Sequence, residues 1–259
     1  MRRVSVFVVV LLLFASLVYA QTVVERSSFS NMQGWRAGGG DWVTSGGRLV
    51  QRNERAALAR IDKRIDAGGV YQIDFDIRYV DGGYASERDM RNGYYHAGFG
   101  VHVGVADPPL GRTAWGNGES YLLWLNLDTR PQTRRNHPEH YGFRAQVYES
   151  VSHSQMGLWE SRAAREMFGD PVMSVDLIQA LRNYGVNFSI NDLIDYLDRD
   201  VPVSIRVNTR TGEIGVKDPT APIRFYFTVD NPRLVRGDYV SLRTNALSAS
   251  YDDFSVTQR

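Results

Sequence analysis

The chain has 259 residues, is 43% hydrophobic and 12% aromatic, and carries a formal net charge of +1 from 30 basic and 29 acidic residues. This balance argues against nucleic acid as the main partner. The absence of cysteine excludes disulfide bonds and a lipid-modified N-terminal cysteine, so packing must supply the stability.

The first twenty residues have the pattern of a secretory signal peptide. Arg2 and Arg3 precede an apolar run, 4–18, that is short for a membrane span, and Val18-Tyr19-Ala20 places small residues at a cleavage site. We therefore expect a signal peptide at 1–20 and a secreted or periplasmic mature chain, 21–259, without a membrane span. An uncleaved N-terminal anchor is the alternative. Export without cysteine is more typical of a bacterial envelope.

Alternation of apolar and polar residues predicts strands along most of the mature chain. The predicted strands are 70–80, 95–105, 120–128, 142–149, 203–208, 213–217, 223–229, 239–244 and 248–257. Turn signals such as Asp81-Gly82-Gly83 and Thr211-Gly212 separate them. Many short antiparallel strands joined by turns predict an all-β fold, a two-sheet antiparallel jelly-roll sandwich.

Residues 152–200 interrupt this pattern with apolar residues at helical spacing. Ser174 is the expected N-cap of one helix, Ser189 or Asn191 that of a second, and a further helical turn is expected within 158–168. We interpret 152–200 as a helical insertion within a single domain, 21–259. It either caps one edge of the sandwich or forms a lid or wall over a ligand groove.

Motifs near both ends of the mature chain carry a family resemblance. They are Phe29, Gln33-Gly34-Trp35, Gly40-Asp41-Trp42, 46–51 (GGRLVQ), 237–244 (GDYVSLRT) and 249–256 (ASYDDFSV). Together they resemble the concanavalin A-like lectin/glucanase superfamily, in particular its laminin-G-like and keto-disaccharide-hydrolase-like bacterial domains. The resemblance implies a jelly roll with Trp35 and Trp42 in its core, but no single activity, because the fold hosts binders, hydrolases and lyases. The E-x-D-x-x-E strand motif of the family's β-glucanases is absent, so their retaining chemistry is not expected.

The polar faces of the predicted strands supply candidate ligand-binding residues. These are Asp76, Arg78, His102, Trp124, Asn126, Arg144, Gln146 and Arg206. If their strands share one sheet, the face offers an indole ring and planar polar groups, which suit the C–H surfaces and paired hydroxyls of a sugar. Glycines 98, 100 and 104 would leave that face open to a polysaccharide chain. Trp115 is a further exposed candidate. The alternative is a solvated outer face with Trp124 tucked under the insertion.

Two enzymatic hypotheses use the same face, with Asp76, His102 and Tyr148 as candidate catalytic residues. Asp74 or Asp76 with Glu149 could be the acid and base of a glycoside hydrolase. In β-elimination of a uronate polymer, arginine or glutamine neutralises the carboxylate while histidine and tyrosine transfer protons. Segment 141–148 (YGFRAQVY) has a faint likeness to the tyrosine-bearing strand of jelly-roll alginate lyases, whose other two motifs are absent.

The remaining polar candidates are few. Asp252 and Asp253 occupy the place where related sandwiches often hold a structural calcium, so Asp252 is a candidate calcium ligand; no other cofactor is expected. His137 and His140 lie beside Pro138 without the spacing of a zinc protease and receive no role.

The sequence thus predicts an exported carbohydrate-recognition protein that binds a polysaccharide or glycan on its concave sheet. A polysaccharide-degrading enzyme using the same face, a hydrolase or a lyase, is one alternative. A structural or adhesive envelope protein, meeting a protein partner through the helical insertion, is the other.

Overall fold

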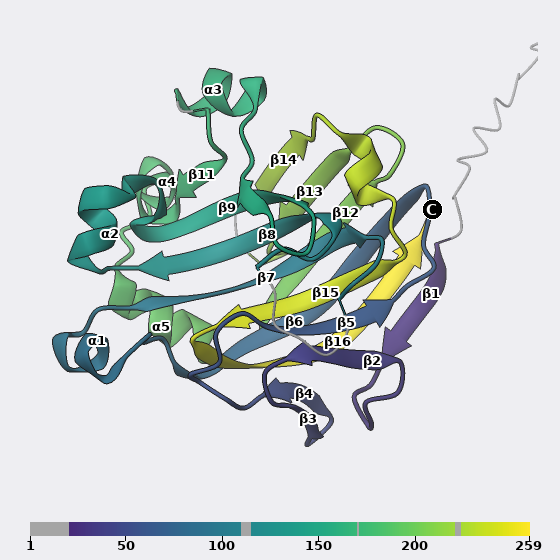
Figure 1. Cartoon of the computed structure of the whole chain (residues 1–259), viewed down its shortest axis with the longest axis horizontal. Helices are drawn as coiled ribbons and strands as arrows, with labels where there is room; N and C mark the ends of the chain where they lie inside the picture. Colours follow the sequence, from purple (N-terminus) through teal and green to yellow (C-terminus); the bar gives the residue numbers. More distant parts are fainter. Residues whose placement is uncertain (1–20, 110–114, 170, 221–223) are drawn as a thin grey trace, which may run out of the picture.

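The computed structural model describes residues 21–109, 115–169, 171–220 and 224–259, which form two antiparallel sheets packed face to face (Figure 1). Each sheet has eight strands: sheet A runs β14-β13-β12-β6-β16-β4-β3 with β1 beside β16, and sheet B runs β10-β9-β8-β7-β15-β5-β2 with β11 beside β9. The predicted all-β jelly-roll sandwich is confirmed.

The bounds of the elements are as follows. Sheet A contains β1 (Thr22–Ser27), β3 (Trp42–Ser45), β4 (Arg48–Gln51), β6 (Val70–Gly82), β12 (Val201–Asn208), β13 (Glu213–Lys217), β14 (Arg224–Thr228) and β16 (Leu247–Gln258). Sheet B contains β2 (Trp35–Gly39), β5 (Ala59–Arg64), β7 (His96–Val105), β8 (Glu119–Asp128), β9 (Gly142–Val151), β10 (Met156–Leu158), β11 (Ser174–Asp176) and β15 (Tyr239–Asn245). The helices are α1 (Glu87–Asn92), α2 (Pro131–Asn136), η1 (Pro138–His140), α3 (Arg162–Phe168), α4 (Leu177–Asn183), α5 (Ile190–Leu197) and η2 (Pro232–Val235).

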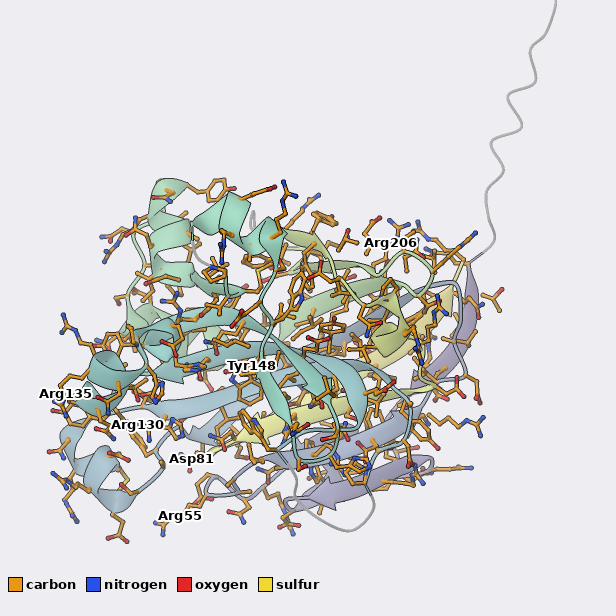
Figure 2. The ribbon with its side chains drawn as sticks, turned by 45° about the horizontal axis from the view of Figure 1, so that its top comes forward. Arg55, Asp81, Arg130, Arg135, Tyr148 and Arg206 are labelled. Atoms are coloured by element: carbon orange, nitrogen blue, oxygen red, sulfur yellow. The ribbon has the colours of Figure 1, made fainter. Side chains whose placement is uncertain are left out.

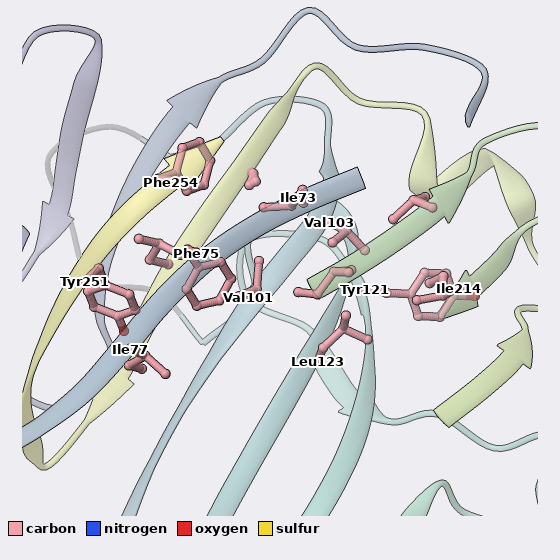
Figure 3. Packing of buried hydrophobic residues seen from close by; sticks show 14 of the residues in the cluster. Ile73, Phe75, Ile77, Val101, Val103, Tyr121, Leu123, Ile214, Tyr251 and Phe254 are labelled. Atoms are coloured by element: carbon pink, nitrogen blue, oxygen red, sulfur yellow. The ribbon is translucent and has the colours of Figure 1, made fainter. Parts of the chain in front are cut away.

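The core lies between the sheets and follows the predicted alternation. In β6 the side chains of Ile73, Phe75 and Ile77 are buried, while the residues between them are only half-buried. Figure 3 shows these side chains packed with Val101 and Tyr121, which come from sheet B. Trp35 and Trp42 are buried, as the family resemblance implies, and Trp159 in the insertion is also buried. Burial of each large apolar side chain contributes about 1.5–3 kcal/mol, so this layer supplies most of the stability.

The helical insertion closes one edge of the sandwich. Leu177 of α4 and Leu193 of α5 pack with Leu127 and Phe143 from the inner face of sheet B, and Phe225 of sheet A packs against the same cluster. Figure 1 shows α1, α2, α4 and α5 at one end of the molecule. The edge-cap interpretation therefore describes α4 and α5.

The insertion also adds two short strands, β10 and β11, to β9. Ser189 caps α5 in a capping box with Asp192, as its position predicts. The N-cap of α4 is Asp176 and not Ser174, which pairs within β11 instead. None of the helices in the described ranges is long and apolar enough to cross a membrane. The predicted signal peptide, 1–20, lies outside the described residues.

Candidate functional site

The predicted ligand-binding residues divide between two opposite faces. Asp76 and Arg78 lie on β6 and Arg206 on β12, which pair with each other in sheet A. The remaining candidates lie on β7, β8 and β9, which are consecutive in sheet B. Figure 2 accordingly places Arg206 apart from Tyr148. The prediction that all these residues share one face is therefore wrong, because alternation identifies outward side chains but not the sheet to which each strand belongs.

On the outer face of sheet A, two of the charged candidates, Arg78 and Asp252, belong to an ion-pair network with Arg48 and Asp200. Arg48 contacts Asp200 at 2.8 Å and Asp252 at 3.1 Å, and Arg78 contacts Asp200 at 2.7 Å. Burial and the neighbouring aspartates raise the pKa of Asp76. Among the described residues no group of three or more His, Cys, Asp or Glu side chains is arranged to hold a metal ion. Calcium at Asp252 stays a prediction.

The proposed hydrolase pair is not assembled. Asp74 and Asp76 belong to sheet A, whereas Glu149 lies on β9 of sheet B, where it accepts a hydrogen bond from Tyr121 at 3.3 Å. Tyr121 belongs to the core between the sheets. Two carboxylates on the outer and inner sides of different sheets cannot flank one glycosidic bond.

His102 points to the outer face of sheet B, but it is completely buried. Its ring nitrogens contact Ser120 Oγ at 3.1 Å and Arg243 Nη1 at 3.0 Å, and Arg243 also donates to the carbonyl of Trp115. Burial and the guanidinium groups of Arg243 and Arg60 hold the pKa of His102 well below its usual range, so the imidazole is neutral. His102 is therefore neither a direct ligand-binding residue nor a catalytic one in this structure. The sequence gives no sign that Trp115 and Asn117 contact Arg243 and Ser241 on this face.

The glycines on this face make room for the protein itself and not for a ligand. A methyl group on Gly98 would lie 2.3 Å from Cζ2 of Trp124, and one on Gly100 would lie 2.8 Å from Cε3 of the same indole. The Trp124 ring therefore lies directly over β7. Gly104, with a φ of +72°, instead allows close approach of the backbone at Val235. Trp124 is half-buried.

An aromatic cluster occupies the outer face of sheet B around β8 and β9. We use this name for Trp115, Trp124, His140, Arg144, Gln146 and Tyr148. The His140 and Tyr148 rings stack at 6.2 Å between centroids with an angle of 11°, and Trp115 meets Tyr148 edge-on at 5.9 Å. Trp115 is 43% exposed, as predicted, and the His140 side chain is 30% exposed. Trp124 lies opposite Gln146 in the β8–β9 pairing.

Polar groups within the aromatic cluster are mostly bonded to one another or to the backbone. Gln146 donates to the carbonyl of Glu139 at 2.9 Å and to Ser174 Oγ at 3.0 Å. Arg144 donates to Ser174 Oγ and to the Ser174 carbonyl, both at 2.7 Å. Asn126 donates to the His140 carbonyl at 2.7 Å and accepts from Trp124 at 3.4 Å. This web fixes η1, and with it His140, against sheet B.

His140 and Tyr148 are in direct contact within the cluster. Tyr148 Oη lies 3.2 Å from Nδ1 of His140 and 3.1 Å from Oε1 of Gln146. Burial lowers the pKa of His140 and raises the pKa of Tyr148, so at neutral pH the imidazole is uncharged and the phenol keeps its proton. The pair therefore presents a neutral acceptor beside a neutral donor.

Sequence reasoning placed Trp124, Asn126, Arg144, Gln146 and Tyr148 correctly on one face, but it missed two of their neighbours. It gave His140 no role because its spacing to His137 fits no metal motif, and it assigned Ser174 to a helix cap. Ser174 reaches the site because β11 pairs with β9, and His140 reaches it because it lies in the short helix η1. No local pattern in the sequence reports either contact.

Comparisons with known proteins support the fold. No family model matches the chain, and no curated protein matches its sequence. Among solved structures, the CBM2 module of the evolved Dit of Lactobacillus casei BL23 phage J-1 aligns with a TM-score of 0.53 at 12% identity, over 92% of this chain and 95% of the module. A Bacillus subtilis protein of unknown function with a galectin-like fold aligns with a TM-score of 0.49 at 12% identity, over 92% and 98% of the two chains. The lectin from Bauhinia forficata in complex with GalNAc aligns with a TM-score of 0.48 at 9% identity, over 92% and 98%.

At 12% identity, the alignment with the CBM2 module supports the fold alone. The class that the fold defines is a two-sheet antiparallel jelly-roll sandwich. The comparisons do not single out the laminin-G-like or keto-disaccharide-hydrolase-like domains that the sequence motifs resemble.

Proposed function

We propose that this chain is an exported carbohydrate-recognition protein that binds a polysaccharide or glycan at the aromatic cluster of sheet B. The observation that carries the proposal is the grouping of Trp115, Trp124 and His140 around fixed polar groups on one outer face. Sugar rings pack their C–H faces on such rings and use planar polar groups for their hydroxyls. The CBM2 module that shares the fold is named for carbohydrate binding, which supports the same function here.

The rigidity of the cluster also favours recognition. Arg144 donates a hydrogen bond to Ser174, and Gln146 donates one to the carbonyl of Glu139. These bonds hold the side chains of the cluster in one geometry without a ligand. A site formed in advance loses less conformational entropy on binding.

A panel of polysaccharides tests the proposal. The chain 21–259 is passed through gels or beads that carry each polymer, beside Trp115→Ala, Trp124→Ala and a control, Tyr226→Ala. Tyr226 is 58% exposed on β14 of sheet A, so it offers an equally accessible aromatic on the other sheet. We expect retention on at least one polymer, roughly tenfold weaker in each tryptophan variant because an anchoring aromatic contributes on the order of 1–2 kcal/mol, and unchanged in the control.

Two results would reject the proposal. One is a polymer that is retained equally by both tryptophan variants but not by Tyr226→Ala. The other is the absence of retention on every polymer, which would turn attention to a protein partner at the exposed Tyr184 and Val186 of the insertion.

β-Elimination of a uronate polymer is the second candidate function, favoured by the contact between His140 and Tyr148. In that reaction a base removes the proton at C5, an acid protonates the oxygen that leaves C4, and a C4=C5 double bond forms. A neutral imidazole and a protonated phenol suit these two roles. However, Tyr148 is only 6% exposed and Gln146 only 2%, which favours recognition. Release of unsaturated products with ultraviolet absorbance, lost in His140→Ala, would establish the lyase instead.

A further inference from the structure

We infer that Arg243, held by His102, positions Trp115 in the aromatic cluster, so that the exposed indole is fixed before a ligand binds. Arg243 and His102 are buried outside the aromatic cluster and thereby acquire a role in it. The effect of that role on ligand binding rests on the proposed function. The ordering of Trp115 itself is measurable without any ligand.

Trp115 is held on several sides although nearly half of its surface is exposed. Its Nε1 donates to the carbonyl of Met156 at 2.7 Å, and its ring packs nearly perpendicular to the ring of Tyr148. Its own carbonyl accepts a hydrogen bond from Nη1 of Arg243 at 2.7 Å, and the Arg243 guanidinium carbon lies 5.9 Å from the indole centroid. Arg243 thus contacts both the backbone and the ring of Trp115.

Arg243 is itself fixed by a buried chain of hydrogen bonds. It is 1% exposed, and its Nη1 donates to Nε2 of His102 at 3.0 Å. A guanidinium can only donate, so Nε2 of His102 accepts and its Nδ1 carries the proton. That Nδ1 donates to Ser120 Oγ at 3.1 Å, and Ser120 donates to the carbonyl of Asn117 at 3.3 Å. The chain of bonds therefore returns to the segment that carries Trp115.

A second anchor fixes the rest of that segment. Asn117 Nδ2 donates to Ser241 Oγ at 2.7 Å, and Ser241 donates to Asp62 at 2.7 Å, whose carboxylate pairs with Arg60 at 3.0 Å. A methyl group on Gly116 would lie 1.9 Å from the carbonyl of Ser152, so this backbone has no room to shift. Residues 116–118 are pinned by these contacts, and Arg243 extends the same order to Trp115.

The composition of the network argues for positioning over simple coverage. Apolar side chains would cover sheet B at lower cost, because buried guanidinium and imidazole groups lose their hydration. A guanidinium offers donors in a rigid plane, which lets Arg243 orient His102 and the Trp115 carbonyl together. The benefit is a binding surface whose largest aromatic group does not have to be ordered when the ligand arrives.

Fluorine NMR of protein labelled with 5-fluorotryptophan tests the inference without a ligand. Trp115→Phe assigns the Trp115 signal, which is then followed in Arg243→Met and in a matched control, Arg64→Met, whose arginine is exposed on the adjacent strand β5. We expect the Trp115 signal to move towards the free amino acid in Arg243→Met and to stay in place in the control. An unchanged signal in a folded Arg243→Met protein would overturn the inference.

Milder disruption and a binding measurement complete the test. If Arg243→Met does not fold, Ser120→Ala removes the partner of His102 together with the hydrogen bond from Ser120 to the Asn117 carbonyl, and should shift the Trp115 signal in the same direction; no shift would overturn the inference. On a polymer that the wild type retains, Arg243→Met should weaken binding as much as Trp115→Ala, roughly tenfold, with no further loss in the double variant. A Trp115 signal that moves in a protein retained by no polymer would support the positioning role and reject the proposed function. Weaker binding with an unmoved Trp115 signal would reject the positioning role and support the proposed function.

Discussion

Replacing Asp128 with asparagine should destabilise the protein and loosen the segment that carries His140. Asp128 ends β8, is 2% exposed, and accepts hydrogen bonds from the Arg130 guanidinium at 2.7 Å and from Thr133 at 2.9 Å. His96 contacts the same carboxylate at 2.9 Å. Through these bonds Asp128 fixes the start of α2, which leads directly into η1 and His140.

The expected loss follows from the burial of this ion pair. Removal of one partner from a buried, hydrogen-bonded pair costs about 3–5 kcal/mol. The Arg130 side chain is 20% exposed, so solvent can hydrate its guanidinium in part when the carboxylate is lost. We therefore expect the free energy of unfolding of Asp128→Asn to fall by about 3 kcal/mol at neutral pH.

The same variant should change how stability depends on pH. Burial by itself raises the pKa of Asp128, but hydrogen bonds from His96 and Arg130 outweigh it and hold the pKa well below its usual range. The native state therefore binds fewer protons than the unfolded chain once the pH falls below about 3.9, the unfolded pKa. Stability from Asp128 is complete above that pH and is lost as the pH falls towards the folded pKa, so the wild type and the variant should converge in acid.

Urea unfolding followed by tryptophan fluorescence, at neutral pH and in acid below the unfolded pKa, measures both effects. Asp195→Asn is the control, because Asp195 is an exposed aspartate on α5. A loss below about 1 kcal/mol at neutral pH, the size expected of an exposed pair, would refute the reasoning. So would a difference between wild type and variant that does not shrink in acid.

Three further variants separate stability from binding. Gly98→Ala forces a methyl group against Trp124 and should lower stability by about 1–3 kcal/mol in thermal unfolding, whereas Gly157→Ala, which has no atom within 4 Å of the added methyl, should not. Leu193→Ala should lower stability by about 2–5 kcal/mol while the folded protein keeps its polymer retention, because α5 packs between the sheets; weaker retention would restore the lid interpretation. Arg206→Ala should leave retention unchanged in the same gels, and a loss would move the site to sheet A.

The strands could be predicted because their signal is local. Tyr71, Ile73, Phe75 and Ile77 alternate with polar residues along β6, and this period of two is visible without knowledge of any partner strand. The same holds for the cap of α5 at Ser189, whose capping box lies within four residues. Outward placement of Arg144, Gln146 and Tyr148 on β9 followed from the same rule.

Contacts between distant segments could not be predicted in this way. Asp76 and His102 looked equivalent in sequence, yet one lies on sheet A and the other is completely buried on sheet B between Ser120 and Arg243. The strand β5 was not predicted, and its two charged residues, Arg60 and Asp62, are both 1% exposed and paired with each other. Their partners Pro109 and Ser241 are distant in the sequence, so no local pattern indicates that these groups are buried.

The burial of β7 and β15 on both faces of sheet B should slow the opening motions that expose their amide groups. The strands β7 and β15 are buried along most of their length. The core lies on one side; on the other side Trp124 lies over Gly98 and Gly100 of β7, and Asn117 and Trp115 contact Ser241 and Arg243 of β15. Their amide groups can reach solvent only when both layers separate, which amounts to global unfolding. Hydrogen exchange should therefore be slowest in β7 and β15 and faster in the short strands β10 and β11, so that the middle of sheet B is the last part of the molecule to open.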